Sequence, residues 1–128
     1  MSYYFSKTIQ ASFEEAIQRA TDSLKTEGFG VLTEIKIHEK LKEKLGVDFQ
    51  RYTILGACNP AYAYKALQSE NKIGTMLPCN VVVQDLGDGN IEIAAVNPIE
   101  SMKAIDNPEL GAVATQVTEM LKRVVLSV

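Results

Sequence analysis

The chain contains only two cysteines, Cys58 and Cys79, and their surroundings are alike. Cys58 is followed by Asn59 in the stretch GACNPAYAYKAL, and Cys79 is followed by Asn80 in the stretch TMLPCNVVV. Two thiols can bind a soft metal ion, carry out redox or nucleophilic chemistry, or simply fill an apolar core. The residue types leave these roles open, and we expect Cys58, Asn59, Cys79 and Asn80 to mark a ligand-binding site.

The number of available ligands argues against a metal site. A structural zinc ion normally takes four Cys or His ligands, whereas this chain offers two cysteines and one histidine, His38. His38 lies in the charged stretch KIHEKLKEK, where we expect it to be exposed. Two copies of the chain can pool their thiols into a four-sulfur site, or copper(I) can bind two of them. We therefore assign no metal ligand and leave the cofactor unknown.

Thiol chemistry requires a lowered pKa and access to the sulfur. Cys58 comes just before a predicted helix start, whose dipole stabilises a thiolate. Against this, the chain has no CxxC motif, and cysteines are among the residues most often buried. The sequence also lacks a GxSxG elbow, a phosphate loop and a GxGxxG motif, so no catalytic residue is assigned.

The two asparagines have different predicted roles. Asn59 is expected to cap the helix that begins at Pro60, which would leave few backbone N–H groups to hold an anion. Asn80 lies in the apolar run LPCNVVV, and a buried amide needs hydrogen-bond partners. Asn80 is expected either to hydrogen-bond its turn to the neighbouring strand or to line a pocket, and we favour the hydrogen bond.

The elements that position these residues follow from local patterns. Strands are predicted at residues 3–9, 30–35, 51–58, 77–86 and 90–96, with a hairpin turn at Asp88-Gly89. Helices are predicted at residues 13–27, after Ser12 as N-cap, and at residues 37–46. Two more are predicted to begin at Asn59-Pro60 and at Asn107-Pro108.

The resulting order is β-α-β-α-β-α-β-β-α, in one domain spanning residues 1–128. The final hairpin and the short polar second helix argue against a doubly wound parallel sheet. We predict an α+β fold with a mainly antiparallel sheet and two long helices on one face. Cys58 ends the third strand and Cys79 begins the fourth, so an antiparallel pairing of these strands brings both to the same end of the sheet.

The segments ILGACNPAYAYKAL and GTMLPCNVVV, preceded by LKEKLGVDFQRY, resemble the domain-of-unknown-function family 302 over nearly the whole chain. The resemblance implies a TBP-like, helix-grip α+β fold that often forms a dimer, and it implies no established activity. The family's motif falls on Gly56, Cys58, Asn59, Pro60, Leu77, Pro78, Cys79 and Asn80. This chain has Lys36 where an acidic helix-start residue is expected.

Composition excludes several classes of protein. The chain is 46% hydrophobic and 23% charged, which is typical of a globular protein. Its net charge of −3 argues against a nucleic-acid partner. We see no signal peptide and no apolar run of the roughly 20 residues that would span a membrane. Two cysteines do not make a secreted disulfide scaffold, so we expect a cytoplasmic protein with reduced thiols.

Three functional hypotheses follow. The first is a non-enzymatic homodimeric module that binds a small ligand or metal ion near Cys58 and Cys79. The second is an enzyme or carrier in thiol or sulfur chemistry, with Cys58 as the reactive thiol and Cys79 as its resolving partner. The third is a purely structural or interaction protein, in which the two Cys-Asn segments only stabilise the fold.

Overall fold

The computed structural model describes residues 2–128. Its strands are β1 (Tyr4–Gln10), β2 (Gly30–Lys36), β3 (Tyr52–Cys58), β4 (Cys79–Gly87) and β5 (Asn90–Val96). Its helices are α1 (Phe13–Thr26), α2 (Ile37–Leu45), α3 (Pro60–Ser69), α4 (Pro98–Ser101) and α5 (Pro108–Ser127), with a 3-10 turn, η1, at Ile73–Met76.

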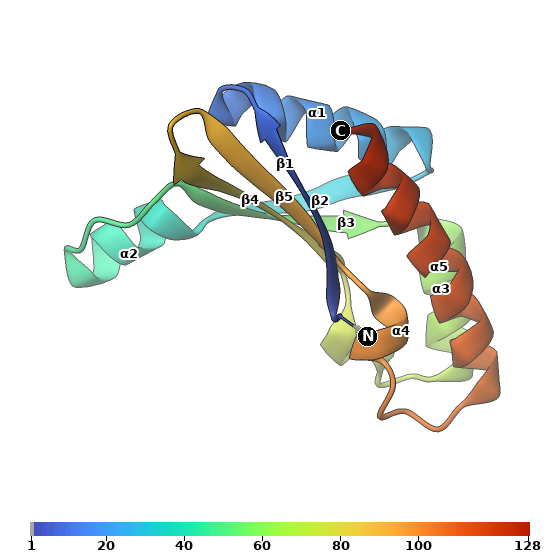
Figure 1. The fold of residues 1–128 in the computed structure, drawn as a ribbon. Helices are drawn as coiled ribbons and strands as arrows, with labels where there is room; N and C mark the ends of the chain where they lie inside the picture. The colour runs from blue at the N-terminus through green and yellow to red at the C-terminus, as the bar shows by residue number, and fades with distance from the viewer. Residues whose placement is uncertain (1) are drawn as a thin grey trace.

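The five strands form one sheet in the order β1-β5-β4-β3-β2, and every neighbouring pair is antiparallel (Figure 1). The predicted α+β class, the antiparallel sheet and the order of the predicted elements are confirmed. Two short elements were not predicted: η1, which precedes β4, and α4, which lies between β5 and α5.

Local signals set the ends of several elements. The Ser12 hydroxyl accepts a hydrogen bond from the Glu15 backbone N–H at 3.1 Å and caps α1. The Asn107 side chain accepts bonds from the first turn of α5, as the Asn-Pro signature predicts. Asp88 and Gly89 both have positive φ, of 56° and 78°, which is the requirement of a type I′ hairpin turn. These predicted starts and turns are confirmed.

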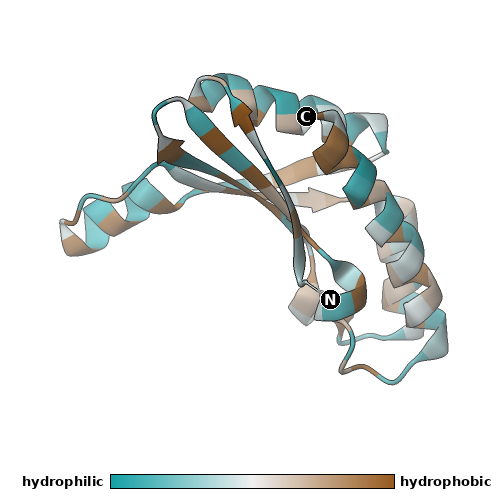
Figure 2. Ribbon diagram, in the orientation of Figure 1, coloured by the Kyte–Doolittle hydropathy of each residue, from teal (hydrophilic) through white to brown (hydrophobic). Residues whose placement is uncertain are grey.

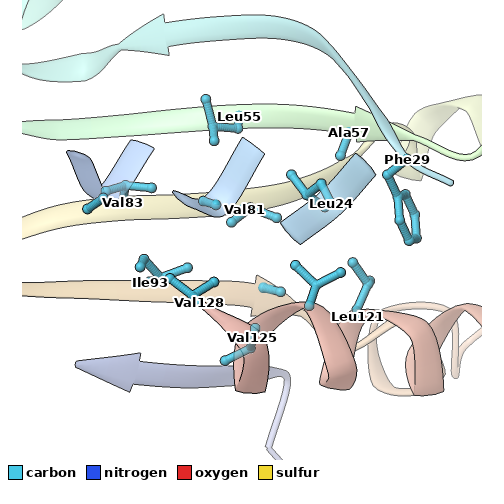
Figure 3. Close-up of a cluster of buried hydrophobic side chains, with 14 of the residues drawn as sticks. Leu24, Phe29, Leu55, Ala57, Val81, Val83, Ile93, Leu121, Val125 and Val128 are labelled. Atoms are coloured by element: carbon cyan, nitrogen blue, oxygen red, sulfur yellow. The ribbon is translucent and has the colours of Figure 1, made fainter. Parts of the chain in front are cut away.

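The core lies between the sheet and the two long helices, α1 and α5, which both pack on the same face (Figure 1). Apolar residues alternate along the strands because only every second side chain points toward the helices (Figure 2). Each fully buried Leu, Ile or Val contributes roughly 1.5–3 kcal/mol relative to an exposed one. The close-up in Figure 3 shows this layer, which includes Leu24, Leu55, Val81, Val83, Ile93, Leu121 and Val125.

Within residues 2–128, no long helix packs on the opposite face of the sheet, which we call the open face (Figure 1). The pairing register assigns its side chains. They are Tyr4, Ser6, Thr8 and Gln10 of β1, Asn90, Glu92, Ala94 and Val96 of β5, Asn80, Val82 and Gln84 of β4, Tyr52 and Ile54 of β3, and Thr33 and Ile35 of β2.

Helix α2 extends away from the two long helices at one end of the molecule (Figure 1), and none of its residues is buried. Its first turn nevertheless contacts the body of the protein. The His38 Nδ1 atom accepts a hydrogen bond from the Tyr52 backbone N–H at 2.9 Å, and the ring packs edge-to-face against Phe13. The prediction of an exposed His38 is therefore wrong, because the histidine lies on the inner side of the helix. No helix of the described residues is long and apolar enough to cross a membrane.

Candidate functional site

The register of β3 and β4 brings the two cysteines to the same end of the sheet. Ala57 lies opposite Cys79 in this antiparallel pair, and Cys58 is the next residue, the last of β3. The sequence prediction that an antiparallel pairing would bring the thiols to one end is confirmed. Between β3 and β4 the chain reverses direction through α3 and η1, which lie beyond the end of the sheet that holds the cysteines.

A cavity of about 280 Å³ opens at this end of the sheet, between the strand ends, α3 and α5. Helix α3 packs against α5 and so closes one side of it. Both cysteines contribute to its wall. The lining residues are Phe29, Leu32, Ala57, Cys58, Asn59, Tyr62, Ala63, Ala66, Leu67, Leu77, Pro78, Cys79, Pro98, Met102, Val113, Ala114 and Val117.

The lining of this cavity is almost wholly apolar. Of the residues that the structure describes, no Asp, Glu, Lys, Arg or His lines it. The side chains with a polar atom are the two cysteines, Asn59 and Tyr62. Such a lining favours an uncharged ligand with a large apolar part, because an ion would lose its hydration without a compensating partner.

The two thiols differ in their surroundings. Both are free, and Cys79 is only 9% exposed, whereas Cys58 is half-buried. Burial, and to a smaller extent repulsion by a Cys58 thiolate, raises the pKa of Cys79 to about 11. Cys79 is therefore a neutral thiol at physiological pH, whereas Cys58 is the more accessible sulfur and lies immediately before α3.

Helix α3 begins at Pro60 with Asn59 as its N-cap residue, as predicted, but the Asn59 side chain makes no capping hydrogen bond, so that part of the prediction is wrong. The Asn59 Nδ2 atom donates a hydrogen bond to the Glu27 carbonyl at 3.3 Å. Glu27 is the C-cap of α1, where helix carbonyls lack partners within the helix. The Glu27 carboxylate also forms an ion pair with Arg123 of α5 at 2.9 Å, so contacts from α1, α3 and α5 meet beside the cavity.

Asn80 lies on the other side of the sheet from the cavity. It pairs with Gly56 and is exposed on the open face, because successive side chains of a strand point to opposite sides. The expectation that the Asn80 amide is buried and hydrogen-bonded to the neighbouring strand is therefore wrong. Asn80 instead lines a second hollow, of about 370 Å³, on the open face. The structure brings together Cys58, Asn59 and Cys79, and it separates Asn80 from them.

Gly56 and Pro78 fix the geometry of the strand ends. A Cβ atom at Gly56 would overlap the Thr33 hydroxyl and come within 2.9 Å of Pro78 Cγ. Glycine at position 56 thus allows Pro78 to lie against β3, and this close approach aligns the start of β4.

Several walls of the cavity come from a segment that the sequence analysis missed. Pro98 and Met102 belong to the short helix α4 and its C-cap. The Asn97 side chain accepts a hydrogen bond from the Ile99 N–H, so Asn97-Pro98 is a third Asn-Pro helix start. The same signal that predicted α3 and α5 would have revealed this helix, although not its contact with the cavity.

Metal binding gains no support from other residues. Within residues 2–128, no three or more His, Cys, Asp or Glu side chains are grouped so as to hold a metal ion. The two thiols alone match only a soft ion of low coordination number such as copper(I).

The fold and site define a small α+β protein with a five-stranded antiparallel sheet and with two free thiols beside an apolar cavity at one end of that sheet. The family model of the domain of unknown function DUF302 matches residues 5–128, and the chain belongs to this family. The family assignment suggested by the two Cys-Asn segments is thus confirmed.

A solved structure has the same fold over its full length. The crystal structure of an uncharacterized conserved DUF302 protein from Bacillus stearothermophilus is 31% identical in sequence and superposes with a TM-score of 0.91. The match covers 99% of this chain and 98% of that one. A comparison with curated proteins gave no significant match. Membership of the family therefore brings a fold and no assigned activity.

Proposed function

We propose that this protein is a non-enzymatic, homodimeric module that binds a small ligand in the cavity beside Cys58, Asn59 and Cys79. The observation that carries this proposal is the cavity itself, which has both thiols in an almost wholly apolar wall. Hollows of similar size occur elsewhere on the molecule, but this one is lined almost wholly by apolar side chains, as small-molecule sites usually are. An apolar space of about 280 Å³ at a junction of strands and helices therefore supports a binding role.

The cavity favours a ligand of defined character. Its volume of about 280 Å³ is near the lower end of the range of about 300–1,000 Å³ for ligand sites, so the ligand is small. Its uncharged lining favours an apolar molecule with at most one or two polar atoms. The Asn59 amide and the Cys58 thiol are placed to contact such atoms, and Cys79 contributes apolar contact because its thiol stays protonated.

The homodimeric part of the proposal rests on a different surface. The open face of the sheet is uncovered in the single chain, and it carries aromatic and aliphatic side chains that include Tyr4, Tyr52 and Ile54. Association of two copies would remove this apolar surface from water. We place the protein in the cytoplasm, where reducing conditions keep free thiols such as Cys58 and Cys79 reduced.

Thiol chemistry is the second candidate function. It is favoured by the position of Cys58, which is accessible and lies directly before the N-terminus of α3. The surroundings of Cys79 weigh against it. A resolving thiol must ionise to attack, and burial keeps the pKa of Cys79 at about 11. We therefore rank thiol chemistry below ligand binding.

Methionine methyl groups offer a direct test of the cavity. Met102 lines the cavity, whereas Met120 on α5 does not. In protein labelled with [methyl-¹³C]methionine, titration with toluene as an apolar probe should shift the Met102 methyl resonance in a saturable way. The Met120 resonance should change much less, because its methyl group packs elsewhere in the core.

A matched pair of variants locates the binding event. Ala63 lines the cavity, and Ala61 lies exposed on the same helix outside it. Ala63→Leu should fill the space and weaken the toluene response at least tenfold, whereas Ala61→Leu should leave it unchanged. A Met102 resonance that does not respond to toluene, or that responds equally in both variants, would contradict binding in the cavity and support the purely structural role.

A further inference from the structure

The open face has the composition of a protein interface rather than of an ordinary surface. Only one of its fifteen side chains, that of Glu92, is charged, whereas 23% of the whole chain is charged. Two of the chain's tyrosines, Tyr4 and Tyr52, lie on it, and Tyr3 at its margin is 72% exposed. Depletion of charge together with enrichment of aromatic residues distinguishes the centres of interfaces from the rest of a protein surface.

The segment from α2 to the start of β3 is a second exposed apolar surface, in which the Phe49 ring has an aromatic neighbour in its own chain, Tyr52, at 6.2 Å between ring centroids. Helix α2 has no buried residue in the single chain. Leu45 is 70% exposed, Val47 is 44% exposed and Phe49 is 49% exposed, so three large apolar side chains within five residues face water. A free helix end that exposes such a cluster is normally covered by another surface.

We infer that the open face is covered by a second copy of the chain, whose α2 and following segment, residues 37–49, lie across it. The inference rests on the homodimeric part of the proposed function and is independent of the cavity ligand. Because each copy carries both an open face and an α2 segment, a twofold axis satisfies the two contacts at once and closes the assembly.

Charge supports this pairing. Residues 37–49 contain three lysines against Glu39, Glu43 and Asp48, and the adjoining Lys36 brings the charge of residues 36–49 to +1. Three of the lysines form ion pairs within their own chain, whereas Lys44 forms none among the described residues. The only charge on the open face is the Glu92 carboxylate, whose Oε1 atom accepts one hydrogen bond from Gln84 at 2.8 Å. Lys44, which has no ion-pair partner among the described residues, therefore brings a positive charge toward a face whose single charge is negative.

The shape and the area of the open face also support its pairing with α2 of a second copy. The hollow of about 370 Å³ on the open face is lined by Tyr4, Tyr52, Val82 and Glu92, among others, and is large enough for a leucine or phenylalanine side chain. Five strands spaced about 4.8 Å apart and about 23 Å long present roughly 550 Å² of face. Together with one side of α2, each copy approaches the roughly 800 Å² that a partner contributes to a stable interface.

Sedimentation velocity of the full chain tests the assignment. The wild type should sediment as a dimer at micromolar concentrations. Leu45→Lys and Val82→Lys, one change on each of the two surfaces, should each raise the dimer dissociation constant at least a hundredfold. Leu126→Lys is the matched control, because Leu126 is 73% exposed at the end of α5, away from both surfaces, and this variant should remain a dimer. Circular dichroism of each variant checks that it is folded.

Mixing the two variants gives the sharper result. In a dimer of Leu45→Lys with Val82→Lys, one of the two contacts joins an intact α2 segment to an intact open face. The mixture should therefore associate at least tenfold more tightly than either variant alone. An interface of α2 against α2, or of open face against open face, gives no such rescue, and its absence would overturn the inference.

The remaining outcomes separate the proposals. A wild-type chain that stays monomeric at 100 µM would contradict the homodimer and this inference together. A dimer that persists in both variants would overturn the assigned surfaces and leave the homodimer standing. Neither result bears on the toluene titration, which reports only on the cavity.

Discussion

Ala57 of β3 lies directly opposite Cys79 of β4, and both side chains are buried on the face of the sheet that the helices cover. Cys58 is one residue further along, where β3 ends and α3 is about to begin. The same register that brings the two cysteines together thus gives them different access to solvent. A buried thiol and a more accessible one meet at the wall of the cavity, and their chemistry should differ accordingly.

The first prediction concerns the reactivity of the two thiols. With 5,5′-dithiobis(2-nitrobenzoate) at pH 8, the Cys79→Ser variant, which retains Cys58, should react at least about tenfold faster than the Cys58→Ser variant. The reason is that Cys79 is 9% exposed and its pKa is raised, mainly by burial, an effect that persists when Cys58 is replaced. Both variants should react at the same rate in 8 M urea. Equal rates in the native proteins would show that Cys79 is accessible.

The second prediction concerns the pH dependence of stability. The pKa of Cys79 is raised from its usual 9.0 to about 11 in the folded state, so its neutral form contributes stability fully below pH 9. That contribution is lost as the pH rises from about 9 to 11, because the unfolded chain ionises first. The stability advantage of the wild type over Cys79→Ala should therefore fall by about 1.4 kcal/mol between pH 7 and pH 10.

Urea denaturation at each pH measures this difference. The control is Val81→Ala, which removes a buried side chain from the same strand without removing a titratable group. Its free energy of unfolding relative to the wild type should not change over this pH range. A wild-type advantage over Cys79→Ala that is constant from pH 7 to pH 10 would contradict the raised pKa.

The third prediction distinguishes the two asparagines that follow the cysteines. Asn59→Ala should lower the free energy of unfolding by about 0.5–1.5 kcal/mol, because it removes the hydrogen bond to the Glu27 carbonyl. Asn80→Ala should change it by less than about 0.5 kcal/mol, because Asn80 is exposed on the open face. Both values come from denaturant titrations at one protein concentration. A larger effect at Asn80 would mean that its amide has a structural partner.

The fourth prediction concerns the close approach at Gly56. Gly56→Ala should destabilise the protein by about 1–3 kcal/mol, because the new methyl group meets the Thr33 hydroxyl and Pro78 Cγ. Gly30→Ala in the edge strand β2 is the control, since a Cβ atom there meets nothing within 4 Å. Differential scanning calorimetry should show a lower Tm for Gly56→Ala than for Gly30→Ala. A Gly56→Ala variant as stable as the wild type would show that β4 can move away from β3 without cost.

The α+β class and the order of the main elements could be predicted because their signals are local. Ser12, Asn107 and Asp88-Gly89 each act on backbone groups within a few residues, so their caps and turn formed as predicted. The hairpin at the end of the sheet and the polar second helix were enough to indicate an antiparallel sheet. That choice in turn placed Cys58 and Cys79 at the same end.

The roles of the asparagines could not be predicted because they depend on distant partners. Asn59 bonds to the end of α1, 32 residues earlier in the chain, where the Glu27 carbonyl lacks a partner within the helix. Local sequence does not show whether the Asn59 side chain bonds to this distant carbonyl or to the N–H groups of α3. His38 was misjudged for the same reason, since its partner is the backbone of Tyr52.

By itself, the sequence determined the main strands and helices, the antiparallel sheet and the placement of Cys58 and Cys79 at one end of it, because these follow from short-range backbone preferences and from strand order. Only the tertiary structure decided which thiol is buried, which face holds Asn80, and that a cavity separates α3 and α5 from the strand ends. A shift of one residue in register exchanges the two faces of a strand, and a cavity exists only where several distant segments fail to fill a common space.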